Sequence, residues 1–245
     1  MSKRLSARVT PIAILQSGEF SITGQFTWGS NYTFLVEVTQ PGGAPLEAVY
    51  KPQRGERPLW DFPEDSLAGR EVAAWLVSQA LGWGLVPPTV FRDDGPLGPG
   101  SLQLHIPHDP EQHYFTFDDA VRQQLRPTAA FDLLINNADR KGGHILLDPA
   151  GKLWLIDHGI SFHTEPKLRT VIWVFAGEPF PAEVSAGLAR LGPQLAPDGP
   201  LSAALAPYLS QEEIAALEAR RAALLAAGHY PAQPEDQRSV PWPPV

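Results

Sequence analysis

Two stretches in the second half of the chain decide the fold: N-N-A-D-R-K-G-G-H at residues 136–144 and I-D-H-G at residues 156–159. Between them, the turn D-P-A-G-K at residues 148–152 separates two short apolar runs, a pattern typical of a β-hairpin. We expect this turn to pair Leu147 with Leu153. The two polar stretches then flank the open end of one hairpin.

This register brings three chemically active side chains together. His144 falls opposite Ile156 and lies diagonal to Asp157, within a few ångströms across the ladder. Asp139 stands in the loop that leads into the hairpin. An imidazole and two carboxylates that converge in this way suit a divalent cation.

Arg140 and Lys141 follow Asp139 directly and suit an anionic ligand such as phosphate. A plainer interpretation stays open, in which Asp139 caps a helix end and Asp157 pairs with Arg140. In that case His144 is simply a hydrogen-bonded histidine at the start of a strand.

A second candidate pair lies in the first half of the chain. Lys51 ends the apolar strand A-V-Y at residues 48–50, where an ammonium group is costly unless it is paired. Glu71 projects from the helix that follows and is an available partner. Such a pair can present its charge to nucleotide phosphates. Considered alone, each residue is better explained as a solvated surface charge.

The turn T-W-G-S-N at residues 27–31 is a weaker candidate. The backbone amides around Gly29 and Ser30, with the serine hydroxyl, can cover phosphates. An ordinary hairpin turn explains the same residues.

Hydrophobic periodicity divides the chain into a strand-rich half and a helical half, which is an α+β pattern. The first fifty residues are predicted to form strands. A helix capped by Asp65 or Ser66 should end at Gly82, and another should begin with a capping box of Ser210 and Glu213 and end at Gly228. The remaining predicted elements are strands at 89–92 and 101–106 and helices at 118–125 and from Pro127.

The domain plan is a β-rich lobe with one main helix at residues 1–107, a helical lobe carrying the hairpin at 108–230, and a loose Pro-rich tail at 231–245.

The composition narrows the possible functions. The 245 residues include no cysteine, which excludes a disulfide scaffold, a thiolate metal site and a cysteine nucleophile. The net charge of −8 argues against nucleic acid as a partner. Because no apolar run reaches membrane-spanning length, we expect a cytoplasmic protein without membrane insertion.

The order of these parts resembles a protein-kinase-like fold. It is most similar to the atypical branch that includes phosphatidylinositol 3- and 4-kinases and HipA-type bacterial kinases, whose catalytic loop reads approximately D-R-H-x-x-N and whose metal loop reads D-F-G. The counterparts here are D-R-K-G-G-H at 139–144 and D-H-G at 157–159. A bacterial family described as phosphatidylinositol 3- and 4-kinase related is similar over roughly residues 15–225, in the motifs Y-K-P at 50–52, P-L-W-D-F-P at 58–63, R-E-V-A-A at 70–74 and I-D-H-G at 156–159.

For the catalytic centre, the resemblance implies a bilobal kinase-like fold in which Lys51 contacts the α- and β-phosphates of ATP and is oriented by Glu71. Asp139 would orient or deprotonate the acceptor hydroxyl, and Asp157 would hold Mg²⁺ or Mn²⁺. His144 replaces the family's metal-binding asparagine, and imidazole suits manganese or zinc better than magnesium.

For the ligands, the resemblance places His105 and Ile106 in the hinge beneath the adenine. Lys167 and Arg169, with Arg140 and Lys141, would receive an anionic substrate.

The predicted function is an ATP- and divalent-metal-dependent phosphotransferase acting on a hydroxyl of a protein or a small metabolite. Two alternatives stay open: a catalytically silent nucleotide-binding pseudokinase, and an enzyme that transfers AMP. A lipid acceptor is less favoured, because no basic amphipathic helix is present. The sequence leaves the acceptor and the oligomeric state undetermined.

Overall fold

The computed structural model describes residues 10–26, 32–235 and 238–245, so Gly29 and Ser30 lie outside the described residues. Contacts divide the chain into two compact units. The first contains residues 1–57 and 88–105, and the second contains residues 58–87 and 106–245. The functional division at residues 107 and 230 stays a prediction.

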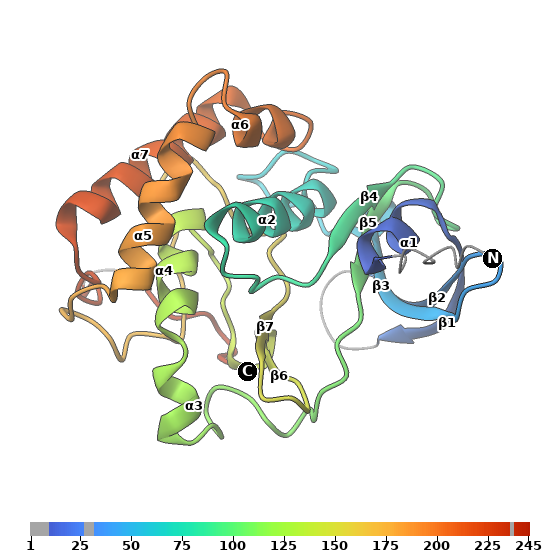
Figure 1. Cartoon of the computed structure of the whole chain (residues 1–245), viewed down its shortest axis with the longest axis horizontal. Coiled ribbons are helices and arrows are strands. Elements are labelled where there is room, and N and C mark those ends of the chain that lie inside the picture. Colours follow the sequence, from blue (N-terminus) through green and yellow to red (C-terminus); the bar gives the residue numbers. More distant parts are fainter. Residues whose placement is uncertain (1–9, 27–31, 236–237) are drawn as a thin grey trace, which may run out of the picture. The chain divides into compact units, whose positions relative to one another are not determined.

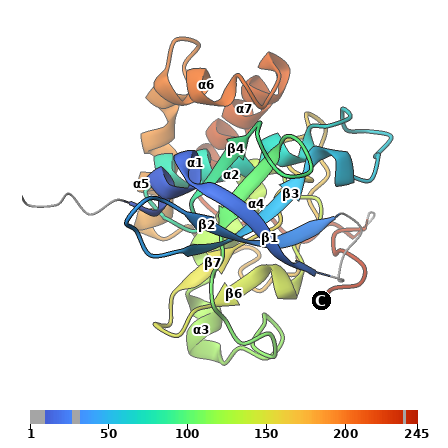
Figure 2. The same ribbon diagram turned by 90° about the vertical axis from the view of Figure 1, so that its right-hand side faces the viewer.

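The first unit is an antiparallel sheet with the strand order β1-β2-β3-β5-β4 (Figures 1 and 2). Alternate residues of its central strands, such as Val36, Val38 and Tyr50, are buried. Helix α1 (Pro11–Ser17) contacts strands β2 to β5 and contributes Leu15 to their core. The strands are β1 (Glu19–Phe26), β2 (Thr33–Thr39), β3 (Leu46–Pro52), β4 (Thr89–Arg92) and β5 (Gly100–Leu104).

Helix α1 differs from the all-strand prediction for the first fifty residues. Pro11 occupies the first turn of the helix, where a missing amide proton costs nothing. Seven residues make only two turns, so the helical period is too short to stand out in the sequence.

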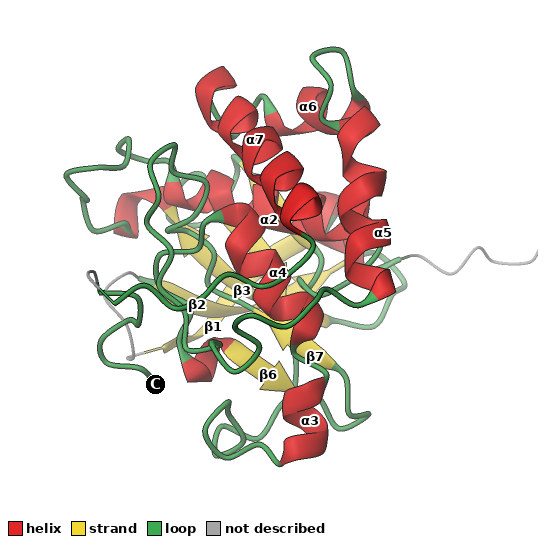
Figure 3. Ribbon diagram, turned by 90° about the vertical axis from the view of Figure 1, so that its left-hand side faces the viewer, coloured by secondary structure: helices red, strands yellow, loops and turns green. Residues whose placement is uncertain are grey.

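The second unit is mostly helical (Figure 3). Helix α2 packs against α5 and α6, and α7 packs against α4 and α5, around a shared apolar core. None of the described helices is long and apolar enough to cross a membrane. The helices are α2 (Leu67–Leu81), α3 (Asp119–Gln123), α4 (Arg126–Ile135), α5 (Ala182–Leu191), α6 (Pro200–Leu205) and α7 (Gln211–Ala227), with 3₁₀ turns at Gln53–Gly55, Gly142–His144 and Gly192–Gln194.

Most predicted helix ends are confirmed. Ser210 and Glu213 form the predicted capping box of α7, and Gly82 and Gly228 end their helices in the left-handed conformation. Ser66 precedes α2, but its hydroxyl donates to the carbonyl of Pro63 and accepts no capping hydrogen bond from an amide of the helix.

The predicted hairpin is formed by β6 (Ile145–Leu147) and β7 (Leu153–Leu155), and Leu147 pairs with Leu153 as expected. The amide of Ile156 donates to the carbonyl of His144 at 3.1 Å, so these residues also face each other. The open end of the hairpin therefore has the geometry on which the site prediction depends.

The end of the Pro-rich tail is held in place, contrary to the expectation of a loose segment. The carbonyl of Ser239 accepts hydrogen bonds from the amide of Thr170 at 3.0 Å and from the indole of Trp173 at 3.2 Å. The carbonyl of Pro244 accepts from the amide of Gly142 at 2.7 Å. The tail thus contacts the predicted catalytic loop, which no local sequence pattern indicates.

Candidate functional site

The candidate catalytic loop begins where helix α4 ends. Asn136 adopts the left-handed conformation, and its side-chain amide donates to the carbonyls of His163 and Glu165. The side-chain oxygen of Asn137 accepts from the amide of Asp139 at 2.9 Å. Short polar side chains suit this role because they bond locally to backbone groups. The two asparagines thus shape the loop that carries Asp139.

Asp139 is a partly buried carboxylate in a charged environment. Burial raises its pKa, and the negative charge of Asp157 raises it further, while the ammonium of Lys141 at 3.4 Å opposes the change. A carboxyl group with a raised pKa is a better proton acceptor at neutral pH than an ordinary aspartate. The two predicted acidic residues are therefore close enough to influence each other.

His144 and Asp157 meet at the open end of the hairpin, with Nε2 of His144 3.2 Å from Oδ2 of Asp157. Asp157 has a φ of 61°, in the left-handed region that non-glycine residues seldom occupy. Such a conformation costs about 1–3 kcal/mol and persists only when the surrounding structure enforces it.

These two side chains fit a shared divalent ion. Two ligands of one ion, each about 2.1 Å away in octahedral geometry, lie about 3 Å apart. Within the described part of the chain, no group of three or more His, Cys, Asp or Glu side chains is placed to hold a metal. A two-residue site suits an ion that keeps several waters and shares the phosphates of a nucleotide.

Glu71 lies on α2, buried, beside the metal loop. Its Oε2 accepts a hydrogen bond from the amide of His158 at 2.9 Å. A Cβ atom at Gly159 would lie 3.2 Å from the Cβ of Leu67, so the glycine permits a close approach between this loop and the start of α2. Glu71 therefore holds the residue that follows Asp157.

The predicted nucleotide-binding residues of the first unit have clear local positions. Lys51 lies in β3 opposite Ser101 of β5, and its orientation by Glu71 stays a prediction. His105 follows β5, with Nδ1 3.2 Å from Oε2 of Glu47. Ile106 is the first residue of the segment that continues the second unit, and it is buried. Their predicted roles in nucleotide binding stay predictions.

Lys167 and Arg169 lie in the segment after the metal loop, but their environments differ. The ammonium of Lys167 is 2.8 Å from Oδ2 of Asp61 and 5.2 Å from the ring centroid of Trp60. Arg169 is exposed, and its positive charge opposes the rise in the pKa of Asp139 that burial causes. Arg169 is thus the more exposed of the two, and both substrate-binding roles stay predictions.

The structure corrects the prediction that Arg140 binds the substrate. Its side chain is fully buried and forms an ion pair with Asp132 at 3.0 Å, so the guanidinium is shielded from any ligand in solution. In place of the alternative pairing with Asp157, the guanidinium contacts Asp132, the ring of His158 and two backbone carbonyls.

Asp132 was not predicted as part of the site. Its carboxylate also accepts from Asn137 and Thr170, both at 3.2 Å. The available signal was a lone carboxylate on the apolar stretch of a predicted helix, since a buried charge requires a partner.

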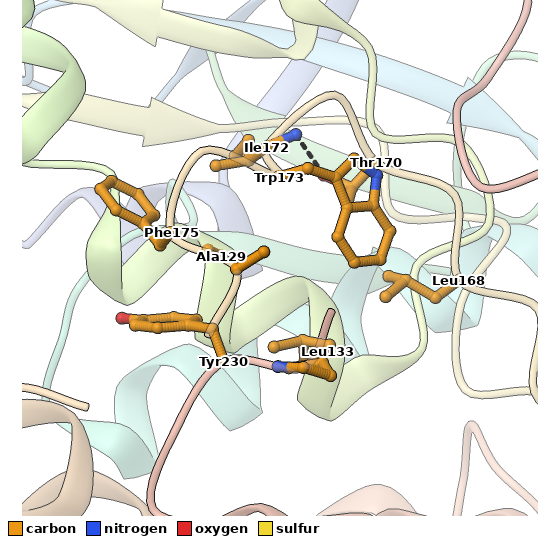
Figure 4. A pocket seen from close by; sticks show the side chains of 10 residues that line it. Ala129, Leu133, Leu168, Thr170, Ile172, Trp173, Phe175 and Tyr230 are labelled. Carbon is orange, nitrogen blue, oxygen red and sulfur yellow. Dashed lines mark hydrogen bonds between the residues drawn. The ribbon is translucent and has the colours of Figure 1, made fainter. Parts of the chain in front are cut away.

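Thr170 also lines an apolar pocket with Trp173, Phe175 and Tyr230 (Figure 4). Its hydroxyl accepts from the amide of Ile172 at 3.2 Å. Asp139, His144 and Asp157 are not among the residues that line this pocket, so it is separate from the candidate site.

Comparison with known proteins supports the fold. The chain is 42% identical to protein Rv2133c of Mycobacterium tuberculosis, over 94% of each chain. No family model matches it. The structure of hydra Fam20 with sugar has a TM-score of 0.54 at 16% identity, over 89% of this chain and 88% of that one. The structure of the Helicobacter pylori proinflammatory kinase CtkA has a TM-score of 0.52 at 11% identity, over 86% of this chain and 93% of that one. The chain thus has an atypical kinase-like fold, which confirms the predicted α+β class.

Proposed function

The chain belongs to the family of protein Rv2133c from Mycobacterium tuberculosis, and we propose that it is an ATP- and divalent-metal-dependent phosphotransferase. The observation that carries the proposal is the 3.2 Å approach of His144 to Asp157 at the open end of one hairpin in a kinase-like fold, with Asp139 close enough for the charge of Asp157 to raise its pKa. Partly buried acidic groups with perturbed pKa values are typical of functional sites. The acceptor is a hydroxyl group of a protein or a small metabolite.

In this proposal Asp139 orients the acceptor hydroxyl and accepts its proton. His144 and Asp157 hold the divalent ion, which when bound neutralises charge on the phosphates. Arg169, exposed near Asp139, attracts an anionic group of the acceptor, and Lys141 keeps the pKa of Asp139 from rising further.

The remaining roles rest on the sequence and on its resemblance to kinases. Lys51 binds the phosphates with Glu71 as its orienting partner, Gly29 and Ser30 cover them, and the segment at His105 and Ile106 receives the adenine. Placement in the phosphatidylinositol 3- and 4-kinase or HipA branch depends on the quoted motifs alone. A cytoplasmic location stays a prediction.

The first experiment measures nucleotide binding and its products. Thermal melting with ATP and either Mg²⁺ or Mn²⁺ should show stabilisation of the wild type and a smaller shift for Asp157→Asn. The matched control is Asp198→Asn, an exposed aspartate in the helical unit, which should behave like the wild type. If no nucleotide stabilises the protein and Asp157→Asn is indistinguishable from the wild type, the proposal fails.

Mass spectrometry of the acceptor after incubation with the protein and ATP distinguishes the possible reactions. An added phosphoryl group supports the proposal, and an added AMP supports nucleotidyl transfer on the same fold. Tight nucleotide binding without any product would identify a silent pseudokinase.

A further inference from the structure

We propose that Arg140 is a positioning residue that holds His144 and Asp157 in the arrangement in which they share a metal ion. This inference rests on the proposed nucleotide-dependent function. It is carried by the contacts of one buried guanidinium group, which reach the residues on either side of Asp157 and the backbone of His144.

The first contacts are with the residues just outside the two strands, at the open end of the hairpin. Nη1 of Arg140 donates to the carbonyl of His144 at 3.3 Å and to the carbonyl of Ile156 at 2.8 Å. One of these carbonyls belongs to a candidate ligand, and the other belongs to the residue before Asp157. The same nitrogen therefore bridges the two backbone segments that carry the candidate ligands, in addition to their direct hydrogen bond.

The next contact is with the residue after Asp157. Nη2 of Arg140 lies 2.9 Å from Nε2 of His158. Because a guanidinium only donates, Nε2 accepts, and the neutral ring carries its proton on Nδ1, which faces Oε2 of Glu71 at 3.6 Å. The amide of His158 donates to the same Glu71 oxygen. His158 is thus held at both its ring and its backbone.

These contacts explain how Asp157 keeps its unfavourable backbone conformation. The carbonyl before it accepts from Arg140, and the amide after it donates to Glu71. With both flanking peptide groups held, the carboxylate is directed toward His144. Outer residues that orient metal ligands typically contribute a factor of about 10–100 to metal affinity.

The guanidinium is itself fixed. Its Nε donates to both carboxylate oxygens of Asp132, at 3.0 and 3.2 Å, and both side chains are fully buried. Asp132 also accepts from the hydroxyl of Thr170, which lies in the segment after the metal loop. Arg140 therefore has little freedom to move toward a ligand, but its rigid fork is well suited to holding the two carbonyls and the His158 ring at once.

The experiment measures Mn²⁺ affinity of the full chain by electron paramagnetic resonance, with and without a non-hydrolysable ATP analogue. Arg140→Lys keeps the charge opposite Asp132 but loses the planar fork, and we expect Mn²⁺ to bind about 10–100-fold more weakly. His158→Leu removes one acceptor, while His158→Gln keeps an acceptor near the position of Nε2. We expect His158→Leu to weaken Mn²⁺ binding and His158→Gln to restore most of it.

The matched control is Arg92→Lys. Arg92 is also buried and donates to two carbonyls and a carboxylate, but it lies in the first unit, far along the chain from the hairpin. The Arg92→Lys substitution should lower the melting temperature without changing the affinity for Mn²⁺.

If Arg140→Lys does not fold, the pair of His158 variants decides. Unchanged Mn²⁺ affinity in a folded Arg140→Lys or His158→Leu protein would overturn the positioning role, whatever happens to its stability. If the wild type binds Mn²⁺ and nucleotide but forms no product, the transferase proposal fails and the positioning role of Arg140 stands. A wild type that binds no Mn²⁺ under either condition overturns both.

Discussion

Each unit of the molecule contains a buried arginine that ties loops together, but the two arginines differ in what they hold. Arg92 in the first unit donates to the carbonyls of Leu15 and Gly18, where helix α1 ends, and pairs with Asp94 at 2.7 Å. Arg140 in the second unit pairs with Asp132. The side chain of Asp94 is 68% exposed, whereas that of Asp132 is fully buried.

The comparison separates a contact that supports the fold from one that supports a site. Water can replace an exposed carboxylate, so the first arginine depends mainly on its carbonyl partners. Both side chains of the second pair are fully buried, so each charge needs the other. Burying this ion pair costs desolvation free energy, and the pair in return fixes the geometry of the candidate metal ligands.

The largest expected effect is that of Asp132→Asn. This change leaves the Arg140 guanidinium buried without its counter-charge, and we expect the free energy of unfolding to fall by about 3–5 kcal/mol. Urea denaturation measures it. The double variant Asp132→Leu with Arg140→Met should recover part of this loss. A loss in the double variant equal to the sum of the losses of Asp132→Leu and Arg140→Met alone would show that the pair is not coupled.

A smaller loss is expected from Arg92→Met, which leaves the carbonyls of Leu15 and Gly18 without this donor. Unsatisfied buried carbonyl groups cost about 1–3 kcal/mol, measured by the same denaturation. Mn²⁺ binding is the second measurement, and it should not change. Loss of metal affinity here would contradict the distinction between the two arginines.

Asp94→Asn should cost less, under about 1 kcal/mol, because the carboxylate is largely in water. The hydrogen bond from Arg92 lowers the pKa of Asp94. The stabilisation is therefore present above the ordinary aspartate pKa and is lost as the pH falls through the lowered value. Denaturation at neutral and at acidic pH checks this, since the variant and the wild type should converge in acid.

The smallest effect on stability is expected for Asp139→Asn. Burial raises the pKa of Asp139, so its contribution to stability falls as the pH rises through the ordinary aspartate pKa toward the raised value. At neutral pH the neutral amide should leave the melting temperature equal or higher, while phosphoryl transfer is lost. A large drop in melting temperature would instead assign Asp139 a structural role.

Several local features could be read from the sequence because neighbouring residues determine them. The turn at residues 148–152 sets the pairing of Leu147 with Leu153, and that register brings His144 opposite Ile156. The capping box at Ser210 and the left-handed Gly228 are equally local. Helix α1 was missed because its two turns contain too little periodicity.

The environment of each site residue was harder to predict. Arg140 and Lys141 are adjacent and carry the same charge, yet Arg140 is buried, whereas Lys141 is only partly buried, beside Asp139. The difference arises because helix α4 places Asp132 within reach of the guanidinium. The tail is a similar case, since its contact with Gly142 joins residues about a hundred positions apart.

The sequence by itself determined the α+β class, the hairpin and the order of the acidic and basic residues, because these depend on turn chemistry and hydrophobic period. Only the tertiary structure decided which charges are buried and paired. Burial depends on contacts between distant segments, and it decides whether a charged group such as Arg140 can meet a ligand or must instead be satisfied by the protein itself.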